Sequence, residues 1–143
     1  MTDQYGIDPR PGTRALADTA YASINMQLDE ACADTVIVSF PITSSARDIH
    51  GRCAFGAIAV AAESAASTAA GIAAGTANRA FGVELNLSYH HAPSDGTVTA
   101  RATAAAIDTD AHVWSIDVTC DTYDAGPIAT GRCLLSIVPA PTA

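Results

Sequence analysis

The sequence has no lysine among its 143 residues. Its seven basic residues are all arginines, they stand against fifteen acidic residues, and the formal net charge is −8. Nucleic-acid binding needs a basic face that displaces the counterions of the phosphate backbone. No stretch of this sequence supplies such a face, so that class of function is excluded. An anionic ligand would have to bind to a few placed arginines or to the free backbone amides at a helix start.

Cysteine pairs of the CxxC type are also absent. The four cysteines, Cys32, Cys53, Cys120 and Cys133, do not show the spacing of a zinc site. We therefore expect no metal, and thiols that stay reduced in a packed protein. The first twelve residues are polar and rich in turn formers, unlike a signal peptide. These features favour a cytoplasmic location.

The chain has the length of one domain, and 49% of its residues are hydrophobic, which is enough for a packed core. Residues 1–12 contain two prolines and two glycines and are expected to form a flexible N-terminal arm. Residues 13–143 are expected to form the single domain. Within it, residues 13–24 are a candidate short helix, residues 34–43 alternate as a strand does, and residues 24–30 are a candidate hairpin partner.

The middle of the chain predicts one long helix. Eleven of the 21 residues from Ala54 to Ala74 are alanine, the best helix former, and the only charged side chain there is that of Glu63. A helix that is apolar on every side is either buried in protein or spans a membrane. A membrane span is disfavoured, because alanine, serine and threonine are only weakly apolar and a central acid is costly in lipid. We predict a buried helix.

Four later segments alternate between apolar and polar residues and predict strands: 81–90, 97–104, 113–120 and 132–137. Turn-forming residues occupy the connections: 93–96, 108–111 and 124–127. In the first strand the apolar series is Phe81, Val83, Leu85, Leu87 and Tyr89. Such a meander can wrap its apolar face around the long helix. The predicted fold class is α+β, with a central Ala-rich helix wrapped by a curved antiparallel sheet.

Glu63 is an acid inside this apolar helix. An unpaired buried charge is costly, so the group finds partners or takes up a proton. From position alone, Glu63 either lies on an exposed stripe, or pairs with an arginine across an interface, or is a tuned acid or base. The preceding loop, residues 48–53, favours the last of these. It is polar, and the helix start that follows it offers free N–H groups that can stabilise an oxyanion.

A resemblance to a known family is carried by residues 42–56, which read ITSSARDIHGRCAFG and are followed seven residues later by Glu63. They resemble hotdog acyl-CoA thioesterases of the phenylacetate-pathway (PaaI-like) type, which read VTPxxxNPHGxxHGG, then six variable residues, then Asp or Glu. Residues 83–89 (VELNLSY) and 97–102 (TVTARA) resemble the family's ELNxxYLRP and GDxLTAxA strands. The resemblance covers residues 24–138 and implies a hotdog fold and thioester hydrolysis.

The resemblance also implies roles for single residues. Glu63 falls on the family's catalytic carboxylate, which acts as nucleophile or as general base on water. Asp48 falls on the family's Asn or Gln, which orients water or the thioester carbonyl. The backbone amides of Phe55 and Gly56 would polarise that carbonyl. The family's HGG reads Ala54-Phe55-Gly56 here, so this motif is degenerate.

Further residues are candidates for binding the substrate: His50, Gly51, Arg52, Ala54, Ser67, Arg79 and Arg101. Ser67 lies four residues after Glu63 and shares its face of the helix. The three arginines are candidates for contacting phosphates. Because the helix acid and the loop come from different subunits in this family, the resemblance implies a homodimer or a dimer of dimers. It implies no cofactor beyond the CoA of the substrate. The charge and the helix composition, as argued above, favour neither a nucleic-acid nor a membrane partner.

Two alternatives stay open. A hotdog dehydratase would use His50 and Glu63, thirteen residues apart, for proton transfer. A non-catalytic hotdog protein would bind an acyl ligand or serve as an assembly partner, and the degenerate motif favours this second alternative.

Overall fold

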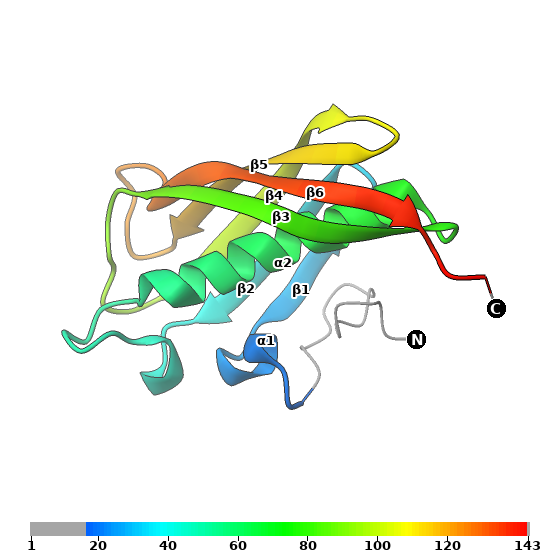
Figure 1. Cartoon of the computed structure of the whole chain (residues 1–143). Coiled ribbons are helices and arrows are strands. Elements are labelled where there is room, and N and C mark those ends of the chain that lie inside the picture. The colour runs from blue at the N-terminus through cyan, green and yellow to red at the C-terminus, as the bar shows by residue number, and fades with distance from the viewer. Residues whose placement is uncertain (1–16, 143) are drawn as a thin grey trace.

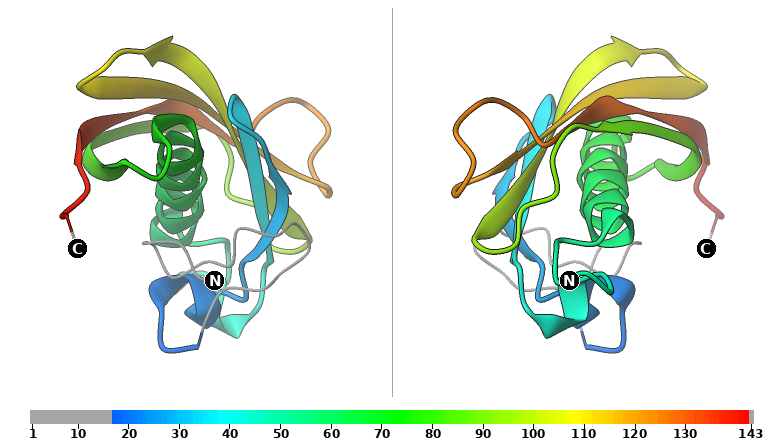
Figure 2. Two further views of the ribbon diagram at one scale, coloured as in Figure 1. Left: turned by 90° about the vertical axis from the view of Figure 1, so that its right-hand side faces the viewer. Right: turned by 90° about the vertical axis from the view of Figure 1, so that its left-hand side faces the viewer.

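The computed structural model describes residues 17–142, and Figure 1 shows an α+β fold in which one long helix lies against a curved sheet. All strand pairs are antiparallel, in the order β1-β2-β4-β5-β6-β3. Figure 2, which looks along the helix, shows the sheet arching over it. The elements are α1 (Ala20–Ser23), β1 (Gln27–Ala31), β2 (Thr35–Pro41), η1 (Ser44–Ala46), α2 (Phe55–Ala74), β3 (Asn78–Tyr89), β4 (Thr97–Ile107), β5 (Ala111–Cys120) and β6 (Ala129–Pro139).

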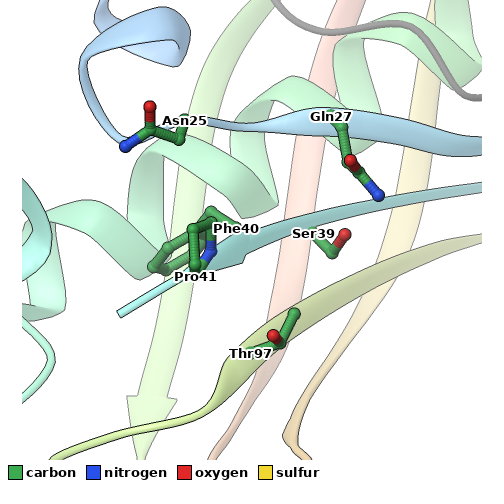
Figure 3. Close-up of a pocket in the computed structure, with 6 residues that line it drawn as sticks. All are labelled: Asn25, Gln27, Ser39, Phe40, Pro41 and Thr97. Atoms are coloured by element: carbon green, nitrogen blue, oxygen red, sulfur yellow. The ribbon is translucent and has the colours of Figure 1, made fainter. Parts of the chain in front are cut away.

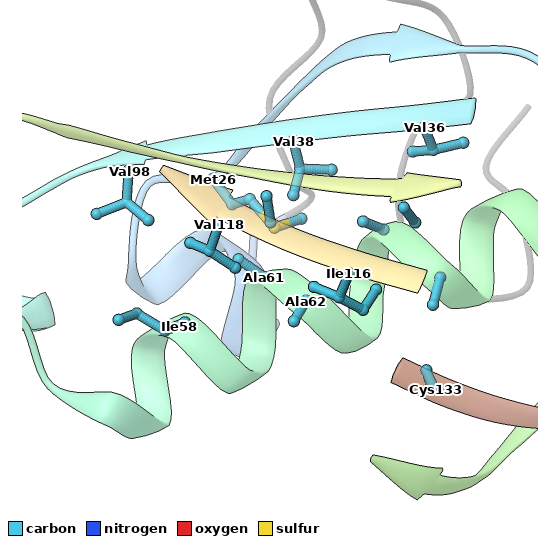
Figure 4. Packing of buried hydrophobic residues seen from close by; sticks show 14 of the residues in the cluster. Met26, Val36, Val38, Ile58, Ala61, Ala62, Val98, Ile116, Val118 and Cys133 are labelled. Carbon is cyan, nitrogen blue, oxygen red and sulfur yellow. The ribbon is translucent and has the colours of Figure 1, made fainter. Parts of the chain in front are cut away.

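The long helix α2 agrees with the predicted one to within a residue. It ends at Gly75, whose φ of 75° is a left-handed conformation that glycine adopts without strain. Its alanines let the sheet approach closely. In Figure 4, Ala61 and Ala62 lie beneath Val118 and Ile116 of β5, and all four side chains are buried. The core is therefore built from small residues on the helix and branched residues on the strands.

Among the described residues, α2 is the one helix long and apolar enough to cross a membrane by length and composition. Most of that segment is buried inside the protein. The prediction of a buried helix is confirmed, because its apolar surface is covered by the sheet.

The alternation of the later strands is confirmed where it concerns the inner face of the sheet. On β5, Trp114, Ile116 and Val118 are buried, and on β6, Cys133 and Leu135 are buried. These side chains point toward α2 because successive residues of a strand face opposite sides. The predicted strand at 34–43 is also found, as β2, with its apolar series in the core.

The prediction for β3 is wrong over the first half of the strand. Phe81 and Val83 are 49% and 59% exposed, whereas Ala80 is buried. The register against β6 shifts within residues 82–84, which is a β-bulge, and the extra residue exchanges the two faces. Beyond the bulge the prediction holds, since partly buried side chains pack against the core: Leu85, Leu87 and Tyr89.

At the N-terminus, the predicted arm, residues 1–12, lies outside the described residues. Of the helix predicted for residues 13–24, the described part contains the single turn α1, Ala20–Ser23. The predicted hairpin partner at 24–30 is β1, which pairs antiparallel with β2. The cysteines are free thiols, three of them buried, whereas Cys32 is exposed.

Candidate active site

Glu63 lies in the middle of α2, on the side that meets β3. The hydroxyl of Tyr21 donates a hydrogen bond to Oε2 at 3.3 Å, and the hydroxyl of Ser67 donates one to Oε1. Gly82 of β3 packs directly against the carboxylate, since a Cβ at that position would lie 3.3 Å from Oε1. The carboxylate of Glu63 is thus fixed by contacts from α1, α2 and β3, and is not a freely rotating surface acid.

A pocket of about 200 Å³ opens beside this carboxylate. It is lined by Glu63, Gly82, Val83, Glu84, Leu85 and Cys133. Sites that enclose a small ligand usually measure about 300–1,000 Å³. The pocket of one chain is smaller than that, and β3, which forms its wall, is the last strand of the sheet. The site beside Glu63 is therefore a small pocket at the edge strand of the sheet.

The cysteine in this pocket is not a competing nucleophile. Burial, with the charge of Glu63, raises the pKa of the Cys133 thiol to about 12. The pKa of Cys53, which precedes α2, is raised to about 11, again mainly by burial. Both thiols are protonated at neutral pH, and thiolates are the reactive form of cysteine. The groups left in the pocket that can attack or accept a proton are the carboxylates of Glu63 and Glu84, and of these Glu63 is the one that two hydroxyls hold in place.

The loop before α2 is organised around Asp48. Its Oδ1 accepts hydrogen bonds from the backbone N–H groups of His50 at 2.8 Å and Arg52 at 3.0 Å. Its Oδ2 accepts one from the Arg52 guanidinium at 3.3 Å. Gly51 completes the turn with a φ of 77°. These bonds, above all the one from the Arg52 amide, hold the pKa of the Asp48 carboxyl below its ordinary value.

The two predicted catalytic carboxylates are not brought together within one chain. A nearby carboxylate would raise the pKa of Asp48, but the charged groups that act on it are Arg52 and His50 of its own loop, which lower it. The hydrogen bonds of Glu63 come instead from Tyr21 and Ser67.

The start of α2 presents free amides. Ala54 is the N-cap residue and its side chain cannot cap the helix, while its carbonyl accepts from the N–H groups of Ala57 and Ile58. Within residues 17–142, no hydrogen-bond acceptor meets the N–H groups of Phe55 and Gly56. Such groups carry the positive end of the helix dipole. Both N–H groups are free to donate to a negatively polarised oxygen.

The bulky side chain of Phe55 packs against Tyr89 of β3. Its ring stacks on that of Tyr89 with centroids 4.0 Å apart, and the Tyr89 hydroxyl donates to the Phe55 carbonyl at 3.1 Å. Burial raises the pKa of Tyr89, so this hydroxyl stays protonated as a donor. The pair ties the end of β3 to the start of α2.

The predicted substrate-binding residues fall into two groups. The first group lies around the helix start or beside Glu63: His50, Gly51, Arg52, Ala54 and Ser67. The second group lies elsewhere in the chain. Arg79 follows Asn78, whose side chain bonds the Ala74 carbonyl at the far end of α2. Arg101 pairs in register with Asp117, between residues of β4 that face the core, so it lies on the outer face of the sheet.

Six residues of the site were missed from the sequence: Tyr21, Gly82, Val83, Glu84, Leu85 and Cys133. A glycine inside an apolar strand is a known sign of a bulge or a close approach, so Gly82 could have been found. Tyr21 and Cys133 come close to Glu63 only in the tertiary fold, so no local sequence pattern predicts that they belong to the site.

Within the described range, no three His, Cys, Asp or Glu side chains gather as metal ligands. A second pocket of about 200 Å³ lies on β1, β2 and β4, and Figure 3 shows its side chains. Ser39 is flanked on β2 by two core residues, Val38 and Phe40, and successive residues of a strand face opposite sides. This pocket therefore lies on the sheet face that points away from α2. It shares no residue with the pocket at Glu63.

The family profile of the Thioesterase superfamily matches residues 50–124, which span part of the loop, α2 and strands β3 to β5. The chain belongs to the thioesterase superfamily. No curated protein sequence matches the chain significantly.

Solved structures of superfamily members resemble this one. A thioesterase from Haemophilus influenzae has a TM-score of 0.80 at 20% identity, with 86% of this chain and 85% of that chain covered. A thioesterase from Staphylococcus aureus has a TM-score of 0.78 at 27% identity, with 82% and 97% covered. The phenylacetic acid degradation protein PaaI from Thermus thermophilus has a TM-score of 0.71 at 16% identity, with 80% and 95% covered. The predicted hotdog fold is confirmed.

Proposed function

We propose that this superfamily member hydrolyses an acyl-CoA or a related pantetheine thioester, as a cytoplasmic enzyme of the PaaI-like type. The observation that carries the proposal is the carboxylate of Glu63. It is the charged group of an otherwise apolar helix, and it is held by two hydroxyls at the wall of a pocket. A charged side chain in such a place is costly unless it has a use.

The chemistry follows from the groups at hand. Glu63 takes a proton from water, whose oxygen bonds to the thioester carbon, and the amides of Phe55 and Gly56 stabilise the oxyanion. The C–S bond then breaks, the proton passes to the leaving thiolate, and a carboxylic acid and a free thiol result. In the alternative route, Glu63 attacks the carbon itself and the C–S bond breaks to release the thiolate. Water then hydrolyses the resulting anhydride, which restores Glu63 and supplies the proton of the free thiol. Neither route needs a metal or a redox cofactor.

The site is proposed to lie between two copies of the chain, in a homodimer or a dimer of dimers. Within one chain, the pocket of Glu63 is partial and Asp48 is occupied by its own loop. Next to the pocket, the edge strand β3 exposes Phe81 and Val83, an apolar edge that proteins usually cover. The loop of a second copy would bring its helix-start amides to this Glu63, with His50, Arg52 and Ala54 beside the substrate.

The spacing of the two carboxylates supports this assignment. Two structures of the Staphylococcus aureus protein carry alanine in place of a glutamine and of a glutamate, fifteen residues apart. Asp48 and Glu63 have the same separation here. We therefore propose that Asp48 contributes to the reaction by orienting water or the carbonyl, directly or through the loop that it fixes.

The test is to replace Glu63 by alanine and to measure thiol release from a panel of acyl-CoA esters. We expect kcat/KM to fall by about 10³-fold, the scale of a lost general base. Ser64→Ala is the matched control, because Ser64 is the next residue of the helix, is buried, and has an unpartnered hydroxyl. It is expected to keep the wild-type rate.

If the wild type hydrolyses none of these esters, or if Glu63→Ala is as active as the wild type, the proposed function is wrong. Calorimetric binding of an acyl-CoA without turnover would then support the non-catalytic alternative. The dehydratase alternative would also need His50 of one copy to reach Glu63 of the other, because His50 is exposed in the loop and its backbone N–H donates to Asp48 of its own chain.

A further inference from the structure

We infer that Tyr21 is a positioning residue for the reaction, a role that rests on the proposed function of Glu63. Its hydroxyl donates to Oε2 of Glu63 at 3.3 Å, across 42 residues of sequence. Ser67 donates to the other carboxylate oxygen from the next turn of α2. Each oxygen of Glu63 therefore has its own donor, and the two donors fix the plane in which the carboxylate faces the pocket.

The short helix α1 holds Tyr21 in place. The Thr19 hydroxyl caps it by accepting from the Ala22 N–H at 3.1 Å, and the Met26 N–H closes it by donating to the Tyr21 carbonyl at 3.0 Å. Ile24 and Met26, which follow, are buried in the core. A single turn of helix is not stable alone. Here the cap and the buried residues after it anchor the turn against α2.

Two bends in the chain frame this turn. Asp18 before it has a φ of 64°, and Asn25 after it has a φ of 57°. Neither residue is glycine, so both occupy the left-handed region at some cost, although Asn and Asp tolerate it best. Conformations of this kind persist where the surrounding structure requires them, often at functional sites. Here they flank α1, the turn that carries Tyr21.

The third side of the carboxylate is closed by Gly82, whose missing Cβ leaves 3.3 Å to Oε1. With Tyr21, Ser67 and Gly82 in place, the carboxylate has little room to rotate. A general base gains from such fixation, because small misplacements of a reacting group are costly in rate. A half-buried tyrosine hydroxyl takes an acceptor in any protein. The test must therefore separate a role in the reaction from simple packing.

The variant is Tyr21→Phe, which removes one oxygen and keeps the ring. We expect kcat to fall by about tenfold or more while KM stays within about twofold. Tyr123→Phe is the matched control, since that tyrosine stacks on His91 and does not line the pocket. It is expected to change neither constant.

The background Glu63→Asp distinguishes the positioning role from a structural one. Aspartate is shorter by one methylene group and cannot meet Tyr21 in the same way. Tyr21→Phe should then add little to the loss already caused by Glu63→Asp, because coupled residues are not additive. The same fold-loss in both backgrounds would overturn the proposal and assign Tyr21 to packing.

A measurement that needs no substrate separates the positioning role of Tyr21 from the proposed thioester hydrolysis. The ¹³C NMR signal of the Glu63 side-chain carboxyl, identified by its loss in Glu63→Gln, is expected to move in Tyr21→Phe and to stay in place in Tyr123→Phe. An unmoved signal together with an unchanged kcat overturns the role of Tyr21. If the wild type hydrolyses no thioester, the proposed function fails and the positioning role fails with it. The NMR signal then still decides whether Tyr21 holds the carboxylate.

Discussion

Asp48 lies in the loop before α2, and Glu63 lies within α2 beside a pocket. The carboxylates of these two residues are held by different kinds of hydrogen-bond donor. Asp48 accepts from backbone N–H groups two and four residues away, and its remaining oxygen meets Arg52 of the same loop. Glu63 accepts from side-chain hydroxyls on different elements, with a pocket beside it. One carboxylate organises its own backbone, and the other faces a cavity.

The difference shows which acid is suited to chemistry. Bonds from backbone amides stabilise the charged form of Asp48 and make it a poor proton acceptor, in keeping with its lowered pKa. Their removal would change the shape of the loop. The donors at Glu63 fix its direction and leave it open to the pocket. We therefore propose that Glu63 transfers the proton and that Asp48 has a positioning role.

The largest effect on stability is expected from Gly131→Ala, which separates β6 from β3, the two strands that line the pocket. A Cβ at Gly131 of β6 would lie 1.8 Å from the carbonyl oxygen of Asn86 on β3, so the strands must separate in Gly131→Ala. We expect the free energy of unfolding to fall by about 3 kcal/mol, as in other overpacked variants. Urea unfolding measures this. Gly56→Ala is the control, because its Cβ meets nothing within 4 Å, and an equal loss there would contradict the account.

A smaller effect is expected from Gly82→Ala, which acts on Glu63 and touches its partner Ser67. The new methyl group would press on Oε1 at 3.3 Å and turn the carboxylate. We expect kcat to fall by about tenfold, with little change in stability, because a reacting group is moved by a fraction of an ångström. Steady-state kinetics measure it against Ser88→Ala, an exposed position on the same strand. A wild-type kcat would mean that the fit of Gly82 against Glu63 is irrelevant to catalysis.

The smallest effect concerns the loop and depends on pH. The pKa of Asp48 is lowered in the folded protein, so its charged form stabilises the fold above its unfolded pKa of about 3.9. That contribution is lost as the pH falls from there through the folded pKa. The melting temperature of Asp48→Asn should therefore lie below that of the wild type at pH 7, and the gap should close below about pH 4.

Thermal unfolding over this pH range is the measurement. Asp124→Asn, an exposed acid of another loop, is expected to show no gap at any pH. A gap for Asp48→Asn that stays constant down to the lowest pH would indicate that its carboxylate charge does not hold the loop.

The main elements of the fold and the position of Glu63 could be predicted from the sequence. The alanine-rich run predicts α2 because composition alone decides it, and Glu63 is conspicuous there as the single charge. Strict alternation predicts β5 and β6, since the register of those strands is regular where they pair. The same rule fails for Phe81 and Val83, because a bulge exchanges the faces and alternation cannot report where one occurs.

The partners of Glu63 could not be predicted in the same way. Tyr21 is separated from it by 42 residues, and their contact depends on how α1 docks on α2. Arg101 is a candidate for contacting a phosphate by its charge. Alternation along the strand shows that it shares a face with every second residue, but not which face of the sheet lies toward the site. Local patterns predict elements, whereas contacts between elements follow from packing.

The assignment of chemistry to Glu63 and of loop geometry to Asp48 is tested most directly by one paired measurement on the isosteric variants Glu63→Gln and Asp48→Asn. For each, kcat on the best acyl-CoA ester and the melting temperature are determined together. The account predicts that Glu63→Gln loses about 10³-fold in kcat and keeps its melting temperature, whereas Asp48→Asn melts lower and keeps more of its rate. A Glu63→Gln enzyme with wild-type kcat, or a larger loss of kcat in Asp48→Asn, would contradict it.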